Sequence, residues 1–196
     1  MFLETICIED GVVRNLEAHE KRVQRTAAHF GFTAPSLSRE LENRMPEQPR
    51  KGRVKCRVIY RESIQEVTFE RYYPKEIRSL RLIEASPDYS FKYANRTVLN
   101  NLLALKGDRD EILIVRDGLI TDTSYSNVVL RAGEELYTPT SPLLEGTKRQ
   151  KLLQEGVIKE KRIHKDSLPA YDRLYLINAM LDIEDDVSLP TSKIAR

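Results

Sequence analysis

The stretch DGLITDTSYSNV, residues 117–128, decides the fold of this chain. It opens with Asp117-Gly118, a two-residue turn signal that is typical of tight hairpins. Apolar residues precede and follow this turn, as they do in short strands that are buried on at least one face. The middle of the chain is therefore predicted to form a sheet, with strands at 111–116, 119–123, 126–131 and 135–138.

Further helices and strands are predicted on both sides of this sheet. Before it, Asp10-Gly11 marks a hairpin and Asn15 caps a long helix. After it, Gly146 precedes a helix, and the chain is expected to end in an irregular tail. The elements predicted before the sheet are a hairpin at 2–14, helices at 16–31 and 37–44, strands at 54–60, 65–72 and 78–84, and a helix at 94–106. Those predicted after it are a helix at 147–155, a strand at 157–163, a short helix after Asp166 and a strand at 173–178.

This mixture of helices and strands favours an α+β fold of two small domains. The run Ala85-Ser86-Pro87-Asp88 breaks the pattern between them. We expect a small N-terminal domain over 1–86 and a larger domain over 87–196. With 196 residues and a mass of 22.7 kDa, the chain can bury a core without disulfides or metal.

Composition excludes several classes of protein. Apolar residues make up 40% and charged residues 32%, which is an ordinary globular composition. No apolar run approaches the ~20 residues of a membrane span, and Glu4 interrupts any signal-peptide core. A net charge of +2 gives no nucleic-acid footprint. Cys7 and Cys56 have neither zinc nor redox spacing, so we expect a reduced, cytoplasmic protein.

The common catalytic motifs are missing from the sequence. It contains neither the G-x-G-x-x-G nor the P-loop phosphate motif. The three histidines show no H-E-x-x-H spacing, and no Cys/His cluster offers ligands, so no metal is expected. No G-x-S-x-G elbow marks a nucleophilic serine. These absences leave most ordinary enzyme chemistries without an anchor.

Four motifs in the second half of the chain resemble one enzyme family. In order, they are Phe91-Lys92-Tyr93-Ala94-Asn95-Arg96, residues 117–128, Tyr137-Thr138-Pro139 and Leu143-Leu144-Glu145-Gly146-Thr147-Lys148-Arg149. The opening from Phe2 through the first predicted helix also looks similar. The order and spacing resemble those of fold-type IV pyridoxal-phosphate enzymes, the class IV aminotransferase family. That family includes branched-chain aminotransferases, D-amino-acid aminotransferases and 4-amino-4-deoxychorismate lyases.

The resemblance implies a cofactor, a fold and a homodimer. The cofactor would be pyridoxal 5'-phosphate, and the fold would be the family's two-domain α+β fold. Two departures from the family pattern stand out. The chain begins inside what is normally the family's first long hairpin, and Asp122 stands where relatives usually have glutamate.

The resemblance also implies roles for individual residues. Lys92 would attack the cofactor aldehyde and later take a proton from the substrate. Asp122 would face the pyridine nitrogen and keep it protonated. The phosphate would be held by Arg22, by the helix start at Gly146, Thr147 and Lys148, and by backbone groups of Asn178 and Ala179. Ser126, Asn127 and Leu144 complete the cofactor-binding set implied by the motifs, with Leu144 packing on the ring.

Plain structural roles remain the alternative for these residues. Lys92 would then be a solvated lysine, Asp122 a turn residue, and Gly146 to Lys148 an ordinary helix start. Leu144 would be a core leucine and Arg22 a surface arginine. Arg57, on the predicted strand at 54–60, is a further candidate, and strand alternation leaves open whether it faces a substrate carboxylate.

Three functions are compatible with these motifs. The first is a lyase that converts 4-amino-4-deoxychorismate, a small-molecule substrate, to 4-aminobenzoate and pyruvate for folate synthesis. The second is an aminotransferase of branched-chain or D-amino acids, and the third is a non-catalytic relative. The pattern Lys-x-x-Asn-Arg from Lys92 to Arg96 looks more similar to the lyases. The shortened N-terminus would also lack groups that aminotransferases of the family use to bind amino-acid side chains. We therefore expect the lyase.

Overall fold

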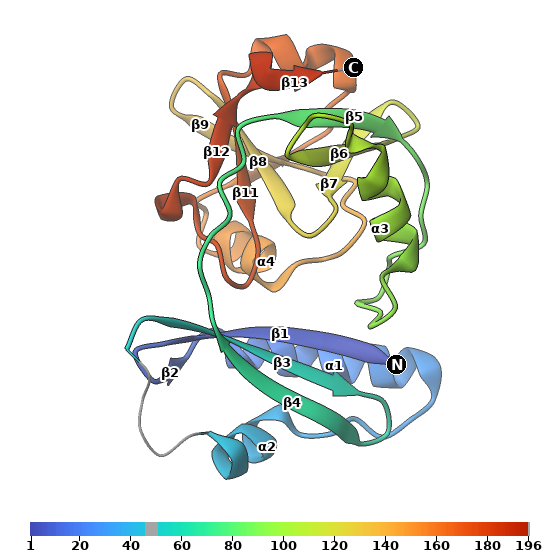
Figure 1. Ribbon diagram of the computed structural model, residues 1–196, viewed down its shortest axis with the longest axis vertical. Coiled ribbons are helices and arrows are strands. Elements are labelled where there is room, and N and C mark those ends of the chain that lie inside the picture. The colour runs from blue at the N-terminus through green and yellow to red at the C-terminus, as the bar shows by residue number, and fades with distance from the viewer. Residues whose placement is uncertain (46–50, 196) are drawn as a thin grey trace. The chain divides into compact units, whose positions relative to one another are not determined.

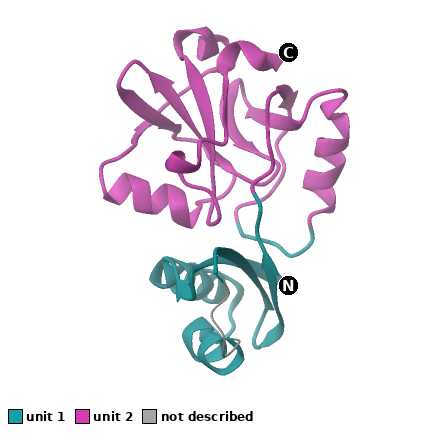
Figure 2. Ribbon diagram, turned by 60° about the vertical axis from the view of Figure 1, so that its left-hand side comes forward, with its two compact units in different colours: residues 1–73, 91–95 teal, residues 74–90, 96–196 magenta. Residues whose placement is uncertain are grey.

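The computed structural model describes residues 1–45 and 51–195, and it contains helices and several sheets (Figure 1). The predicted α+β class is confirmed. The chain forms two compact units (Figure 2). Unit 1 comprises residues 1–73 and 91–95, and unit 2 comprises 74–90 and 96–196. The division into domains at residue 86 stays a prediction.

Unit 1 is a four-stranded sheet with two helices packed on one face. The strand order is β2-β1-β3-β4, and every neighbouring pair is antiparallel. Val23, Leu37 and Leu41 from the helices pack against the buried residues of the strands. The elements are β1 (Phe2–Glu9), β2 (Val12–Val13), α1 (Leu16–Phe30), α2 (Leu37–Arg44), β3 (Arg53–Tyr60) and β4 (Ile64–Arg71).

Strict alternation along β3 separates the two faces of this sheet. Val54, Cys56, Val58 and Tyr60 are buried, and the residues between them are half-buried. The buried set belongs to the core against α1 and α2. Since successive side chains of a strand point to opposite faces, Arg57 lies on the face away from these helices.

The segment 91–95 returns to unit 1 and lies along the edge of β1. Tyr93 bridges Phe2, the amide of Leu3 donates to the carbonyl of Lys92 (2.9 Å), and that of Ala94 donates to the carbonyl of Met1 (3.1 Å). This pairing explains why the helix expected from residue 94 begins only at Thr97. Backbone groups up to Ala94 form hydrogen bonds with the edge of β1, so they are not available for the hydrogen bonds of a helix.

Unit 2 contains two sheets. The first has the order β10-β9-β8-β11-β12, and the second has the order β13-β5-β6-β7. Strand β5 pairs in parallel with β6. The strands are β5 (Leu80–Glu84), β6 (Glu111–Arg116), β7 (Leu119–Thr123), β8 (Asn127–Ala132), β9 (Glu135–Pro139), β10 (Lys159–Lys161), β11 (Arg173–Ile177), β12 (Ser188–Pro190) and β13 (Ile194–Ala195).

Short helices connect these strands. They are α3 (Thr97–Leu103), α4 (Thr147–Gln154), and the 3-10 turns η1 (Ala104–Lys106), η2 (Lys165–Ala170), η3 (Ile183–Asp185) and η4 (Thr191–Lys193). The tail that was expected to be irregular thus contains two 3-10 turns and two edge strands. None of the described helices is both long and apolar enough to cross a membrane.

Candidate active site

Asp122 is a buried carboxylate near the end of β7, in unit 2. Its side chain is 5% exposed and accepts three hydrogen bonds. Asn127 Nδ2 donates to Oδ1 at 2.8 Å, and the backbone amides of Leu143 and Leu144 donate to Oδ2 at 2.9 and 3.0 Å. Asp122 therefore joins the turn after β7 to the loop before α4.

The surroundings of Asp122 leave its carboxylate poised between two protonation states. Burial raises the pKa of Asp122 to about 6, because a charge is costly away from water. The bonds from Asn127, Leu144 and Leu143 oppose this effect, and the charge of Arg149 opposes it further. A carboxyl group with such a pKa is mostly ionised at neutral pH, but it takes up a proton at much milder acidity than an ordinary aspartate does.

Gly146 is a glycine because Asn127 lies against it. A Cβ built on Gly146 would lie 1.9 Å from Asn127 Oδ1, far inside any real contact. The same Asn127 amide that donates to Asp122 also donates to the carbonyl of Leu144 at 2.9 Å. The structure therefore brings four predicted site residues together: Asp122, Asn127, Leu144 and Gly146.

Helix α4 begins directly after this group. Gly146 is its N-cap and supplies no side-chain cap, so the first-turn N–H groups point beyond the helix start. Thr147 is buried, and Lys148 Nζ pairs with Asp182 instead of standing free. Any phosphate contact of Lys148 would therefore use its backbone N–H. A helix start of this kind favours an anion.

Ser126 and Asn178 form a second linked pair in unit 2. Asn178 Nδ2 donates to Ser126 Oγ at 2.8 Å, across 52 positions of sequence. Asn178 and Leu181 exchange backbone hydrogen bonds at 3.1 Å in both directions, which closes a tight turn containing Ala179. This turn follows β11, the neighbour of β8. The predicted residues Ser126, Asn178 and Ala179 thus lie at adjoining strand ends.

In unit 1, Arg22 pairs with a carboxylate buried inside the unit. Arg22 Nε and Nη2 donate to the two oxygens of Glu4 at 2.8 and 2.5 Å, and His19 Nδ1 lies 2.5 Å from Glu4 Oε2. Burial alone would raise the pKa of Glu4, but Arg22 and His19 together lower it to about 2. Burial lowers the pKa of His19, so the neutral ring donates to Glu4.

Lys92 is half-buried at the edge of β1, close to this group. The charge of Lys92 contributes to lowering the pKa of His19. Its backbone is fixed by the bond from Leu3 described above. Arg22 and Lys92 are therefore both tied to β1, through Glu4 and through the strand edge respectively. Arg25, one turn further along α1, is exposed.

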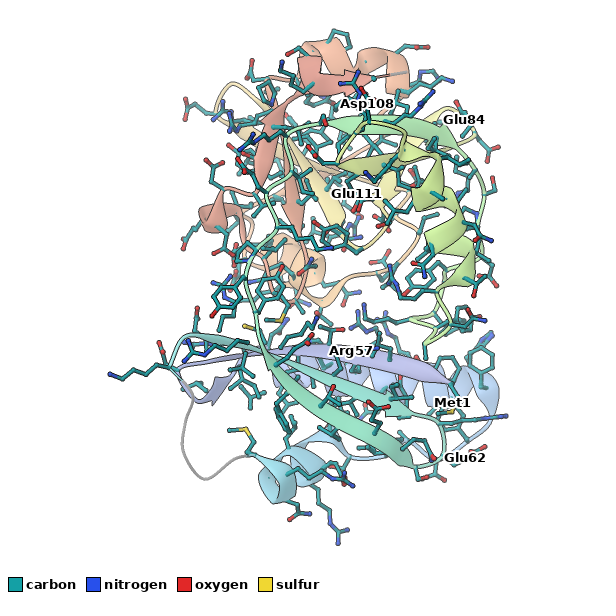
Figure 3. The ribbon with its side chains drawn as sticks, viewed as in Figure 1. Met1, Arg57, Glu62, Glu84, Asp108 and Glu111 are labelled. Carbon is teal, nitrogen blue, oxygen red and sulfur yellow. The ribbon has the colours of Figure 1, made fainter. Side chains whose placement is uncertain are left out.

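Arg57 is labelled in Figure 3, on β3 of unit 1. Its strand neighbours in register are Thr5 on β1 and Thr68 on β4. The carboxylate whose pKa Arg57 influences, Glu70, forms an ion pair with Lys55. Among the residues that the structure describes, Arg57 itself makes no hydrogen bond or ion pair.

Sequence reasoning missed several polar residues of these groups. Glu4 looked like an ordinary strand residue, and His19 like a solvated or partly buried histidine. A charged residue inside an apolar strand run such as FLETICIE is the one signal that points to Glu4. Asp182 lies in a segment without any pattern of its own, and only folding brings Lys148 near it. Arg149 closes one of the quoted motifs, but its pairing with Glu160 of another element could not be foreseen.

Comparison with known proteins gives a consistent picture. The family model described as amino-transferase class IV matches residues 1–184. An uncharacterized protein of Haemophilus influenzae is 34% identical over 180 residues, covering 90% of this chain and 96% of that protein. The aminodeoxychorismate lyase of Bacillus subtilis is 26% identical over 132 residues, covering 61% of this chain and 43% of that protein.

Solved structures agree with this match. A candidate 4-amino-4-deoxychorismate lyase from Haemophilus somnus is 33% identical with a TM-score of 0.86, covering 91% of this chain and 95% of that one. A hypothetical aminotransferase from Mycobacterium tuberculosis, in a form with pyridoxal phosphate bound, has a TM-score of 0.73 at 19% identity. That alignment covers 91% of this chain and 77% of the other, and it supports the fold alone.

Proposed function

The chain belongs to the class IV aminotransferase family of pyridoxal-phosphate-dependent enzymes, and from this premise we propose that it is a lyase. Its substrate would be 4-amino-4-deoxychorismate, and its products 4-aminobenzoate, a folate precursor, and pyruvate. The resemblance to the candidate lyase of Haemophilus somnus supports this choice, because it extends over nearly the whole of both chains at 33% identity. The named lyase of Bacillus subtilis supports it further. A cytoplasmic homodimer is part of the proposal.

The residues of unit 2 fit the chemistry of the cofactor. Pyridoxal phosphate has a basic ring nitrogen and a phosphate dianion at opposite ends of its ring. Asp122, a buried carboxylate with a pKa near 6, suits the ring nitrogen, and the start of α4 after Gly146 suits the phosphate. The juxtaposition of these two features through Asn127 supports cofactor binding at this place, while the choice of a lyase rests on the likeness to the candidate lyase of Haemophilus somnus.

When bound, pyridoxal phosphate withdraws electrons from the substrate carbon that bears the amine. Lys92 would hold the cofactor through its amine until the substrate amine displaces it. The freed Lys92 Nζ would then accept the proton from that substrate carbon, and the neighbouring C–O bond would break to release the enol of pyruvate. Loss of both groups leaves an aromatic ring, which makes the step irreversible.

The other residues would bind and orient. Asp122 would share a proton with the ring nitrogen and so keep positive charge there. Arg22 would bind the phosphate while Glu4 fixes its guanidinium plane. Arg57, with the hydroxyls of Thr5 and Thr68 opposite it, would bind a substrate carboxylate. The substrate carries two carboxylates, so an arginine without an internal partner has a clear use.

The decisive test is to supply 4-amino-4-deoxychorismate to the purified, cofactor-loaded protein. We expect equal amounts of 4-aminobenzoate and pyruvate, without any keto acid, and full recovery of the visible absorption at the end. Leucine, glutamate or D-alanine alone should bleach the visible band only slowly. Rapid bleaching by one of them, reversed by 2-oxoglutarate, with no 4-aminobenzoate formed, would replace the lyase with an aminotransferase.

The role of Lys92 has its own test. Borohydride should fix the cofactor to the peptide that contains Lys92, and Lys92→Ala should abolish that adduct. A protein that stays colourless with added cofactor would instead support the non-catalytic alternative.

Arg22→Ala should weaken cofactor binding about tenfold or more, since hydrogen bonds to charged groups contribute about 1.5–3 kcal/mol each. Arg25→Ala, at an exposed position of the same helix, should change it little.

A further inference from the structure

The side chain of Arg96 makes contacts that the proposed reaction does not use. Arg96 is the first residue of unit 2 after the segment 91–95 and the N-cap of α3. Its Nη2 donates to the backbone carbonyl of Ser124 at 2.6 Å, and its Nη1 donates to Tyr89 Oη at 3.2 Å. The guanidinium also lies 5.9 Å from the centroid of the Tyr89 ring.

These contacts close a loop around Lys92. Tyr89 precedes the segment 91–95 and Arg96 follows it, so their contact joins the two ends of the stretch that carries Lys92. The hydrogen bond from Arg96 to the carbonyl of Ser124 then attaches the joined ends of this stretch to the turn that follows Asp122. Lys92 lies four residues before Arg96, and four residues span at most about 14 Å even when fully extended. Only a short length of chain therefore separates Lys92 from the contacts of Arg96 with Tyr89 and Ser124, which we call the clamp.

The anchor of this clamp is itself rigid. Ser124 is buried, and its amide and hydroxyl both donate to Glu111, at 3.3 and 2.9 Å. Glu111, which is labelled in Figure 3, also accepts the amide of Ile112 at 2.8 Å. The turn is closed by a bond from Thr123 N to Ser126 O at 2.9 Å. Arg96 therefore binds a carbonyl that is held from the other side by a buried carboxylate.

We infer that Arg96 is a positioning residue for Lys92, because it joins the two ends of the short segment that carries this lysine. The inference rests on the proposed role of Lys92 as the cofactor-bearing lysine. The planar fork of arginine suits the task, because two donors on one rigid group bind acceptors from two parts of the chain. A charge-assisted hydrogen bond of 2.6 Å is also among the strong ones. A lysine at this position would keep the charge but lose the second contact.

The first measurement uses the cofactor-free protein. In Arg96→Met we expect the amides of Leu3 and Ala94, which bond to the segment 91–95, to exchange hydrogen about tenfold faster or more. Tyr89→Phe, which removes one hydroxyl, should give a smaller increase. Arg116→Met is the matched control, since Arg116 is another half-buried arginine of unit 2 that has no side-chain partner among the described residues. Its exchange at these amides should match wild type.

The second measurement is the rate at which the protein captures pyridoxal phosphate, followed by its visible band. Arg96→Met should slow capture at least tenfold, and Arg96→Lys should fall between it and wild type. A residue that only stabilised the fold would lower the melting temperature without this loss of capture in the folded protein. If Arg96→Met does not fold, Arg96→Lys and Tyr89→Phe carry the same test.

The outcomes separate the two proposals. If Lys92→Ala still gives a borohydride adduct, the assignment of the lysine fails, while the exchange data still report on the clamp. Exchange and capture within twofold of wild type in Arg96→Met would overturn the inference. Equal effects in Arg96→Met and Arg116→Met would overturn it as well.

Discussion

Glu4 in unit 1 and Asp122 in unit 2 are both carboxylates buried away from water, and they behave in opposite ways. Glu4 in unit 1 is 0% exposed, and its pKa is lowered to about 2. Asp122 in unit 2 is 5% exposed, and its pKa is raised to about 6. Burial raises the pKa of both, and it is the largest single influence on each. The difference therefore lies in what faces the carboxylate.

Glu4 faces a cation, and Asp122 faces neutral donors. The guanidinium of Arg22 binds both oxygens of Glu4, which makes a complete ion pair inside unit 1. Asp122 accepts from an amide side chain and two backbone N–H groups, and among the described residues it forms no ion pair. A protonated ring nitrogen would supply the missing cation. A buried carboxylate thus has room for a cationic ligand group only where no internal cation already pairs with it.

The comparison would be broken most severely by Glu4→Gln. This change leaves the buried guanidinium of Arg22 without its carboxylate, and removing one partner of a buried ion pair costs about 3–5 kcal/mol. We expect the free energy of unfolding, measured in urea, to fall by that amount. Glu17→Gln, at an exposed position of α1 that pairs with Lys21, is the control and should leave the urea midpoint nearly unchanged. Similar midpoints for both variants would contradict the ion-pair argument.

Asp122→Asn tests the other member of the comparison. The amide keeps the size of the side chain but cannot hold a negative charge beside a ring nitrogen. Turnover should fall about 10²–10³-fold, as when one charge-stabilising donor is removed from an active site. Cofactor binding, measured by titration of the visible band, should persist. Wild-type turnover in this variant would mean that the ring nitrogen has another partner.

Acid and base titrations of stability sharpen the contrast. The folded pKa of Glu4 lies below its ordinary 4.5, so its contribution is present above pH 4.5 and is lost as pH falls through about 2. The folded pKa of Asp122 lies above its ordinary 3.8, so its contribution is present below pH 3.8 and is lost as pH rises through about 6. Each spans roughly 3 kcal/mol, at 1.36 kcal/mol per pKa unit.

The measurement is urea unfolding of the cofactor-free protein from pH 4 to pH 7. Burial also raises the pKa of Glu111, so it contributes in the same direction as Asp122. The informative quantity is therefore the difference between wild type and Asp122→Asn. The variant should lose less stability than wild type as the pH rises over this range. Parallel curves would show that Asp122 titrates at its ordinary pKa.

Gly146→Ala gives the smallest expected effect, and it acts on Asp122 indirectly. The new Cβ would meet Asn127 Oδ1 at 1.9 Å, so Asn127 must move and its bond to Asp122 must weaken. Overpacking of this kind costs about 1–3 kcal/mol. Cofactor affinity should fall while the pair Glu4–Arg22 is unaffected. Gly133→Ala, on the turn after β8, meets nothing within 4 Å but is strained by its φ of +59°, so as a control it should lower stability without lowering cofactor affinity.

Elements with a strong local pattern could be predicted from the sequence. Helix α2 begins and ends at the predicted residues, and the turn at Asp117-Gly118 joins β6 to β7 as expected. The expected strand at 157–163 is wrong in extent, since only Lys159–Lys161 pairs, along the edge of β9. Strands β12 and β13 are two or three residues long and depend on distant partners. Such elements carry almost no local signal.

The candidate site divides in the same way. The resemblance assigned Asp122, Asn127 and Gly146 to one cofactor site. The structure brings the three side by side, and their roles stay a prediction. The buried position of Glu4 could not be predicted, because its partner His19 lies on a helix fifteen residues further along the chain. Within the helix predicted at 94–106, Leu99 is buried but Val98 and Leu105 are exposed. The periodicity there describes a helix that is covered on one turn only.

The return of the chain to β1 has a consequence for synthesis on the ribosome. The first strand is made at once, but the segment that pairs with its edge at Phe2 and Leu3 follows only after residues 74–90. At roughly 5–20 residues per second, those residues alone take about one to three seconds. During that interval the edge of a nascent strand stays unpaired, and an open edge can recruit another chain. By pairing with β1, the segment 91–95 therefore also ends the time during which a newly made chain can associate with another through this open edge.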